Sequence, residues 1–315
     1  MTAAVYGFAA LTAMTILVAG LIYRWLWIRF RSQEIVPTGF GAILSFALLA
    51  AALALGMPGD VTLAYGVIAA ASAIYWFDDA IELSPKSRIL ISFVTGVAVA
   101  WLLLAGFFQT APLLIGLCLA AGVINVGLTN VVNFYDGNDL NIATLIGLLA
   151  VTTLVFSIPG SFMQVTALVT LAVVIPFAIL NSRPRTIYFG DAGCFAVASL
   201  LTAMVAIYVR GANDFSPAAV IPMALPTLDV FFVLGIRIVE KHDLLTRNYL
   251  HLYQKLNQRY RGFGYLAPQP LNVALVLGLY LAMRAMGGGA FVSTLLAAAV
   301  VTPIVYFGAR RLFLR

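Results

Sequence analysis

The chain has 315 residues, of which 63% are hydrophobic and only 10% are charged. Soluble domains carry charge on about a quarter of their residues, so this composition excludes an ordinary water-soluble fold and indicates an integral membrane protein. The net charge of +6 would suit nucleic acid, but the basic residues follow a membrane-protein pattern and we expect no such partner. Cys118 and Cys194 lie in apolar stretches, which predicts buried thiols rather than a disulfide.

Apolar runs of membrane-spanning length recur along the chain. A helix needs about 20 apolar residues to cross the hydrocarbon core, within a range of about 17 to 25. We predict eleven spans, with ten left open, and therefore an all-α, polytopic transmembrane helical bundle that forms a single domain over residues 1–315. The predicted spans are 4–23, 40–57, 61–77, 89–106, 111–130, 142–158, 162–180, 192–209, 217–236, 271–286 and 290–308.

Lys and Arg residues indicate the orientation of these spans, because cytoplasmic loops are rich in both. With the N-terminus outside, sixteen of the eighteen basic residues fall on the inner side, and only Arg210 and Arg284 fall outside. This bias favours an odd number of spans and a cytoplasmic C-terminus. Ten of the twelve acidic residues share the inner side. The basic, aromatic segment 237–270 is predicted as a cytoplasmic loop, compatible with a short amphipathic helix on the membrane surface.

The first polar cluster comes at the inner end of the third predicted span. Asp78, Asp79 and Glu82 bring three carboxylates into five residues. Adjacent carboxylates repel each other and stay ionised best beside a hard cation, which takes oxygen ligands. A solvated helix end is the alternative explanation of this cluster.

The second cluster comes at the inner end of the fifth predicted span. Asn130, Asn133, Asp136 and Asp139 surround Gly137, which permits a tight turn. Such groups can hold a nucleotide-sugar or a Mg²⁺ ion that keeps several waters. The alternative is a turn whose amides and carboxylates satisfy only their own backbone.

The third cluster, 181–193, joins the seventh and eighth predicted spans. Asp191 lies at a helix N-terminus, where it could also serve only as a cap. Gly190 and Gly193 are expected to let a ligand approach the backbone, and Arg185 is available for phosphate.

Two further features lie later in the chain. Asp229 lies about 12 Å from the inner end of the ninth predicted span. An ionisable side chain at that depth is costly and indicates function, although it could also pack against a buried Arg or amide. His251, in the basic loop, could donate to a phosphate or take part in acid–base chemistry. The basic residues around it could equally bind anionic lipid headgroups.

Together these clusters place acids that suit Mg²⁺ and bases that suit phosphate on one side of an apolar body. This combination favours phosphoryl transfer at the membrane surface, where catalysis is mainly positioning and charge neutralisation. The main rival is a secondary transporter with a carboxylate-lined cytoplasmic vestibule. Transporters usually place polar groups near the midplane and contain repeats, whereas these clusters lie at one edge and we detect no repeat.

In this order, the clusters resemble the signatures of the polyprenyl-phosphate N-acetylhexosamine-1-phosphate transferases, glycosyltransferase family 4. The D-D-x-x-D/E signature is matched by Asp78, Asp79 and Glu82, with Arg88 at the basic position that follows. The N-x-x-N-x-x-D-G-x-D signature is matched by Asn130, Asn133, Asp136, Gly137 and Asp139. The two later signatures are matched by Asn181, Pro184, Gly190, Asp191 and Gly193, and by Pro226, Asp229 and Arg237.

The resemblance implies transfer of a sugar-1-phosphate from a UDP-N-acetyl sugar to undecaprenyl phosphate at the cytoplasmic face of a bacterial inner membrane, with release of UMP. It implies Mg²⁺ as cofactor, with Mn²⁺ as an alternative, and leaves a homodimer open. Asp79 and Asp191 are the implied metal residues. Asp78 is the candidate that deprotonates or orients the acceptor phosphate. The implied substrate-binding residues are Arg88, Asn130, Asn133, Asp136, Asp139, Asn181, Arg185, Asp229 and Arg237, and His251 is expected to act on the diphosphate.

One segment departs from the family pattern. Many members carry an H-x-H-H loop, but the matching stretch 251–254 reads His-Leu-Tyr-Gln and keeps one histidine. It is similar in this respect to the branch that starts O-antigen with deoxy-N-acetyl sugars, so the transferred sugar stays open.

Overall fold

A computed structural model describes residues 2–30, 37–81, 83–182, 187–211, 214–242, 249–260 and 262–313. Within these ranges the chain is all-helical, with twelve α-helices and two short 3₁₀ helices, which confirms the predicted fold class. The helices are α1 (Thr2–Phe30), α2 (Ala42–Ala54), α3 (Gly59–Ile81), α4 (Pro85–Leu104), α5 (Ala111–Tyr135), α6 (Asn141–Phe156), α7 (Phe162–Asn181), α8 (Gly190–Val209), η1 (Pro217–Met223), α9 (Ala224–Val239), α10 (Leu252–Arg259), η2 (Gly264–Leu266), α11 (Pro268–Ala285) and α12 (Ala290–Phe313).

Every predicted span has a helix at its position, but two of the helices are short. Nine segments of the described chain are long and apolar enough to cross a membrane, and one of them combines η1 with α9. The helices α2 and α6 are apolar but have only 13 and 16 residues. At 1.5 Å per residue they reach about 20 and 24 Å, which is less than the roughly 30 Å of a hydrocarbon core. Both pack against α7, which supports them inside the bundle.

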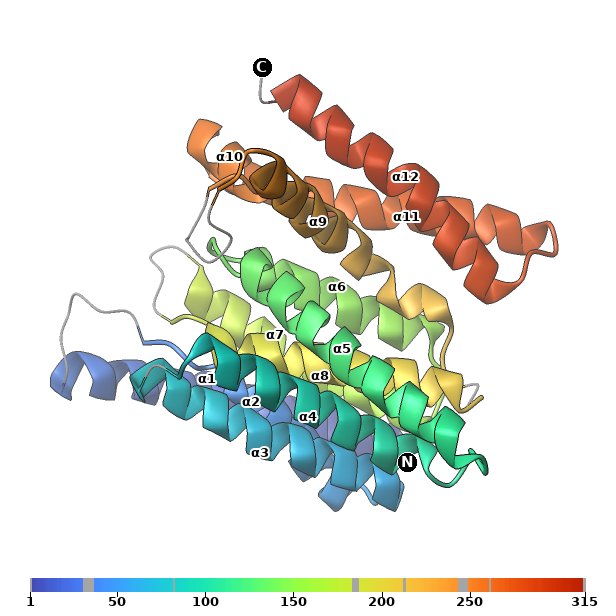
Figure 1. The fold of residues 1–315 in the computed structure, drawn as a ribbon. Helices are drawn as coiled ribbons and strands as arrows, with labels where there is room; N and C mark the ends of the chain where they lie inside the picture. Colours follow the sequence, from blue (N-terminus) through green and yellow to red (C-terminus); the bar gives the residue numbers. More distant parts are fainter. Residues whose placement is uncertain are drawn as a thin grey trace.

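The helices form layers in chain order (Figure 1). The last helices, α9 to α12, lie along one side of the bundle, the first four lie along the other, and α5 to α8 fill the space between them. The central helix is α8: 83% of its apolar stretch is buried, against 22% for α1 and for α5. Large apolar side chains such as Leu11 and Val155 remain exposed on the outside, as lipid-facing residues of a membrane bundle do.

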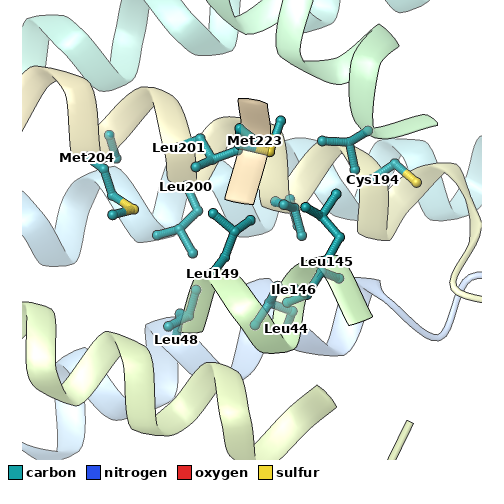
Figure 2. Packing of buried hydrophobic residues seen from close by; sticks show 14 of the residues in the cluster. Leu44, Leu48, Leu145, Ile146, Leu149, Cys194, Leu200, Leu201, Met204 and Met223 are labelled. Atoms are coloured by element: carbon teal, nitrogen blue, oxygen red, sulfur yellow. The ribbon is translucent and has the colours of Figure 1, made fainter. Parts of the chain in front are cut away.

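The core forms where α2, α6 and α8 meet. Figure 2 shows Leu44 of α2 beside Ile146 of α6, and Leu149 of α6 beside Leu200 of α8. All of these side chains are buried. This apolar packing continues along α8 and fixes the helix whose first turn carries Asp191.

A short backbone pairing precedes α8 and fixes where that helix begins. Tyr188 donates its N–H to the Pro37 carbonyl at 2.7 Å, and Gly41 donates to the Phe189 carbonyl at 2.8 Å. Phe40 also donates to the Tyr188 carbonyl at 3.3 Å. The segment before α2 therefore holds the segment before α8 in register.

The glycines beside this pairing serve close packing. A Cβ on Gly193 would overlap the Phe189 ring and the Gly41 backbone, and a Cβ on Gly190 would overlap the Gly39 backbone. Gly190 also has a φ of +81°, a conformation that L side chains rarely adopt. We predicted that Gly190 and Gly193 let a ligand approach, and the structure corrects this: another part of the chain occupies that space.

The segment predicted as a basic loop, 237–270, contains α10. Its apolar residues Leu252, Tyr253 and Leu256 are buried. The apolar face of this short helix therefore packs on the protein. The predicted orientation of the spans and the predicted cytoplasmic location of this segment stay predictions.

Candidate active site

Several of the predicted site residues meet around one cavity of about 560 Å³. It lies among the ends of α3 and α5, the starts of α4 and α8, and the segment that begins α10. Six predicted residues line it: Arg88, Asn130, Asn133, Asp136, Asp191 and His251. Apolar side chains, including Ile89, Val126 and Phe134, complete the wall. The cavity thus offers carboxylates, cationic groups and an apolar surface within one space.

Arg88 links two carboxylates at the cavity wall. Its Nε lies 2.7 Å from Asp78 Oδ2, and its NH1 lies 3.1 Å from Asp191 Oδ2. The side chains of Asp78, Asp191 and Arg88 are 0%, 28% and 37% exposed. The carboxylate behind Arg88 is therefore sealed, whereas the guanidinium and the Asp191 carboxylate open into the cavity.

The structure gives Asp78 a different set of partners from the acceptor phosphate, and its predicted role toward that phosphate stays a prediction. Asp78 is not among the described residues that line the cavity, and both of its oxygens face Arg88. Its Oδ1 also accepts the backbone N–H of Leu83. A carboxylate so engaged is badly placed to contact an acceptor phosphate, but it is well placed to orient the guanidinium. Asp78 points away from the cavity because its side of α3 faces the body of the protein.

Local capping explains how Arg88 reaches this position. Ser84 caps α4 by accepting from Ser87 N, and Pro85 occupies the first turn. Tyr75 of α3 donates its hydroxyl to the Arg88 carbonyl at 2.6 Å, which ties α3 to the start of α4. Arg88 therefore projects from a fixed first turn toward Asp191 on α8.

The end of α5 supplies the amides and the second cavity carboxylate. Asn133 donates its Nδ2 to Asp191 Oδ1 at 3.2 Å, so Asp191 is held from both sides. Asp136 ends α5, and its Oδ2 lies 3.7 Å from the Cys194 Sγ. Asn130 uses its Nδ2 on the Val126 carbonyl at 2.8 Å, which partly fits the alternative of a self-satisfying turn.

The turn after α5 needs a glycine at position 137 because the Tyr253 side chain packs closely against it. A Cβ at Gly137 would overlap the Tyr253 side chain, whose hydroxyl donates to the Phe134 carbonyl at 2.6 Å. The α10 segment is therefore closed down on the end of α5. Gly137 permits this close approach of an aromatic ring.

Asn181 and Asp139 are not among the described residues that line the cavity, and the substrate contacts predicted for them stay predictions. Asn181 accepts the Leu140 N–H at 2.6 Å and donates to the Ile187 carbonyl at 2.8 Å. Leu140 has a φ of +61°, so this side chain supports a strained turn before α6. Asp139 is buried, and its carbonyl accepts from the Tyr265 hydroxyl.

Asp229 lies beneath the cavity rather than in it. Its carboxylate accepts from His251 Nδ1 at 2.9 Å, from Leu252 N at 3.0 Å and from the Tyr306 hydroxyl at 2.8 Å. Arg237, about two turns further along α9, is buried and likewise not among the described residues at the cavity. The structure gives these two residues positions behind the lining, and the direct substrate contacts predicted for them stay predictions.

Three residues of the predicted clusters cannot be placed in this geometry. The backbone of Asp79 belongs to α3, but its side chain lies outside the described part of the structure. Arg185 also lies outside the described residues, as does Glu82. Their roles stay predictions.

The donor set at the cavity fits a hard cation bound together with a phosphate. Among the described residues no group of three or more His, Cys, Asp or Glu side chains could hold a metal ion. Mg²⁺ needs less from a protein, since one or two carboxylates suffice when substrate phosphates and waters complete its octahedron. Asp136 and Asp191, with the amide oxygens of Asn130 and Asn133, provide oxygen donors of that kind.

Among the residues of this region that sequence reasoning missed, three lie around His251 and Asp229. Tyr253 and Gln254 line the cavity, and Tyr306 contacts Asp229 from the last helix. The aromatic character of the basic loop was the one signal for Tyr253. Tyr306 carried none, because an isolated Tyr in an apolar run is indistinguishable from a packing residue.

The fold and the cavity define a polytopic helical membrane bundle with carboxylates and cationic groups at one end of its helices. The sequence model of the family described as Glycosyl transferase family 4 matches residues 61–210. No curated protein matches the chain. The chain thus contains a glycosyl transferase family 4 domain over slightly less than half of its length, which favours a phospho-sugar transferase over a secondary transporter.

The family match divides the site into two parts. It includes α3 to α8 and therefore Asp78, Arg88, Asn133, Asp136 and Asp191. It ends before α9 to α12, which supply the opposite wall with His251. The family implies a UDP-sugar and a polyprenyl phosphate as substrates and Mg²⁺ as cofactor.

Proposed function

We propose that this protein transfers an N-acetylhexosamine-1-phosphate from a UDP-sugar to undecaprenyl phosphate at the cytoplasmic face of a bacterial inner membrane. The observation that carries the proposal is the Arg88 guanidinium, which lies between two carboxylates at a cavity that also has an apolar wall. A diphosphate needs cationic groups and a metal, whereas a polyprenyl chain needs an apolar surface, and this cavity offers both.

The proposed reaction is an in-line displacement at phosphorus. An oxygen of the acceptor phosphate forms a bond to the β-phosphorus of the UDP-sugar, and the bond from that phosphorus to the bridging oxygen breaks. UMP leaves with the bridging oxygen and its electron pair, and the product is a polyprenyl-diphosphate sugar. Direct attack and a phospho-enzyme route both lead to these products.

The chain's own residues would orient the diphosphate and balance its charge. Arg88, fixed by Asp78, and His251, from the opposite wall, would donate to phosphate oxygens. Asn133 and Asp136 would contact the nucleotide-sugar. Asp191, together with Asp79, would hold Mg²⁺ or Mn²⁺, which when bound neutralises charge on the phosphates.

The one-histidine loop supports a narrower proposal for the sugar. We propose that the donor belongs to the deoxy-N-acetylhexosamine class used to start O-antigen, because stretch 251–254 carries one histidine where many members carry three.

Purified protein in nanodiscs tests both levels of the proposal. The assay would combine undecaprenyl phosphate, Mg²⁺ and a panel of UDP-GlcNAc, UDP-GalNAc and their 6-deoxy relatives, with UMP release as the readout. We expect release with at least one sugar, highest with a deoxy sugar, and loss of release in Asp191→Asn. The matched control is Asp214→Asn, distant along the chain from the cavity residues, which should keep full activity. UMP release that survives Asp191→Asn would reject the site, and release confined to UDP-GlcNAc would reject the deoxy-sugar assignment.

A further inference from the structure

We infer that the last helix, α12, is a positioning element for His251, acting through Tyr306, Arg310 and Asp229. The inference rests on the proposed function, since it assigns His251 to the transfer reaction. It extends the site beyond the matched family domain, because all four residues follow residue 210.

The Asp229 carboxylate is the centre of this arrangement. It is 1% exposed, and three donors from two parts of the chain reach its two oxygens. Oδ2 faces His251 Nδ1, while Oδ1 accepts from both Leu252 N and the Tyr306 hydroxyl. A buried carboxylate in a membrane protein is costly, and it is retained here with a complete set of donors. Its effect is to fix the start of α10 and the histidine ring together.

The ring of His251 is held in one orientation. Nδ1 is committed to Asp229, and the ring stacks near Phe134 and Tyr253 with centroid distances of 5.9 Å to each. Since the ring also lines the cavity, its other nitrogen, Nε2, is the one available to a ligand there. A carboxylate on one imidazole nitrogen sets the tautomer and direction of the other. When protonated, this imidazole can donate from Nε2 to a phosphate oxygen while Asp229 balances its charge.

The helix α12 holds this arrangement from a second point. Arg310 donates its NH2 to the Leu250 carbonyl at 2.6 Å, immediately before His251. Its guanidinium lies over the rings of Phe232 and Tyr306, 4.7 and 5.3 Å from their centroids. One turn of α12 therefore contacts both the backbone before His251 and the carboxylate beneath its ring. The helix α12 thereby limits movement of Asp229 and of the backbone that carries the His251 ring.

Steady-state kinetics of a double-mutant cycle test whether Tyr306 acts through His251. The variants are Tyr306→Phe, His251→Ala and the two combined, assayed by UMP release. We expect Tyr306→Phe to lower kcat about 10-fold with little change in KM for the UDP-sugar, as loss of a group that orients a functional residue does. In the His251→Ala background the same change should have no further effect. Effects that multiply in the double variant would overturn the inference.

Tyr280 provides the matched control. It is a buried tyrosine on α11 whose hydroxyl pairs with the Ser216 hydroxyl at 2.9 Å. Tyr280→Phe removes a comparable hydrogen bond and should leave kcat unchanged. If Tyr306→Phe does not fold, Arg310→Met replaces it in the cycle, because it removes the contact to the Leu250 carbonyl. An equal loss of kcat in Tyr280→Phe would overturn the inference by showing a general effect of buried hydroxyls.

Histidine modification separates this inference from the proposed reaction. The chain has two histidines: His251 is 3% exposed, and the side chain of His242 is 54% exposed. Diethyl pyrocarbonate with peptide mass spectrometry measures the reactivity of each without any turnover. We expect Tyr306→Phe to raise the rate at His251 several-fold, with His242 as the unchanged internal reference. An unchanged rate at His251 would overturn the positioning role, whereas a raised rate in a protein that releases no UMP would keep it and reject only the reaction.

Discussion

The packed helices α3 and α8 carry an ion pair at each end, and the two pairs have opposite surroundings. At one end Arg88 joins Asp78 and Asp191 beside the cavity. At the other, Arg210 NH1 lies 2.5 Å from Asp60 Oδ2, and its guanidinium lies over the rings of Phe107 and Phe162. The two acids of α3 are about 27 Å apart along the helix, so the pairs are independent.

The two ion pairs differ in exposure, and only the pair at Arg88 leaves its guanidinium accessible to a ligand. The side chain of Arg210 is 7% exposed and is covered by aromatic rings. Its charge therefore serves to hold the ends of α3 and α8 together. Arg88 is 37% exposed and shares its charge with a carboxylate that opens into the cavity. The same chemistry thus stabilises the fold at one end and is available to a ligand at the other. Four sets of variants separate these uses.

Asp191→Asn should have the largest effect, and it should fall on activity alone. The amide cannot hold a cation as a carboxylate does, and we expect UMP release to fall by about 100- to 1000-fold. Arg88 keeps its partner Asp78, so stability should hardly change. Both free cysteines are buried, so a thiol-reactive dye reports thermal unfolding directly. A large fall in melting temperature would contradict the assignment of this end to ligand binding.

Arg88→Met should lower both activity and stability, and a second change should separate the two. The substitution leaves the sealed Asp78 carboxylate without its cation, which costs about 3–5 kcal/mol for a buried charge. Adding Asp78→Asn should recover most of the melting temperature, because it removes the unpaired charge. UMP release should stay about 100-fold reduced in the double variant. Recovery of activity together with stability would show that Arg88 is structural at this end too.

Arg210→Met and Asp60→Asn should give the reverse result. We expect the melting temperature to fall by a few degrees, because a largely buried pair is broken, with a loss of about 1–3 kcal/mol. Activity per folded molecule should stay within about 2-fold of the wild type, since the cavity lies at the far end of the helices. A selective loss of kcat at unchanged stability would indicate coupling between the two ends.

Gly137→Ala should have the smallest effect, a reduction in activity of about 5-fold with a small loss of stability. The new methyl group would displace the Tyr253 ring and its hydrogen bond to the Phe134 carbonyl, which closes α10 over the cavity. Gly127→Ala on the same helix is the matched control, because the space around that position is open. Equal activities for the two variants would mean that the closure by Tyr253 does not matter for transfer.

Much of the fold could be predicted from the sequence, because apolar length is a local property. The eleven predicted runs coincide with helices, and the composition alone indicated a membrane protein. The shortness of α2 and α6 was less visible. Leu140, in a left-handed conformation before α6, and the pairing before α2 fix those starts, and both depend on contacts with distant segments.

The site was predicted by residue type more reliably than by role. The clusters around Asp136 and Asp191 do meet, although 55 residues separate them in the sequence. What the sequence could not indicate was the direction in which Asp78 points, because packing decides how a helix is rotated about its axis. Asp78 therefore faces Arg88. For the same reason Asn181 and Asp229 support the walls instead of lining them.

The pairing of Pro37 with Tyr188 has a consequence for how the protein is made. The ribosome adds about 5–20 residues per second, so roughly 8–30 s pass between synthesis of the two segments. During that interval α2, which is too short to span the bilayer alone, has not yet packed against its partners α7 and α8. The segment with His251, Tyr253 and Gln254, which forms one wall of the cavity, is translated later still. The nascent chain therefore enters the membrane before its cavity is complete. The order of translation delays transfer chemistry until nearly the whole protein has been synthesised.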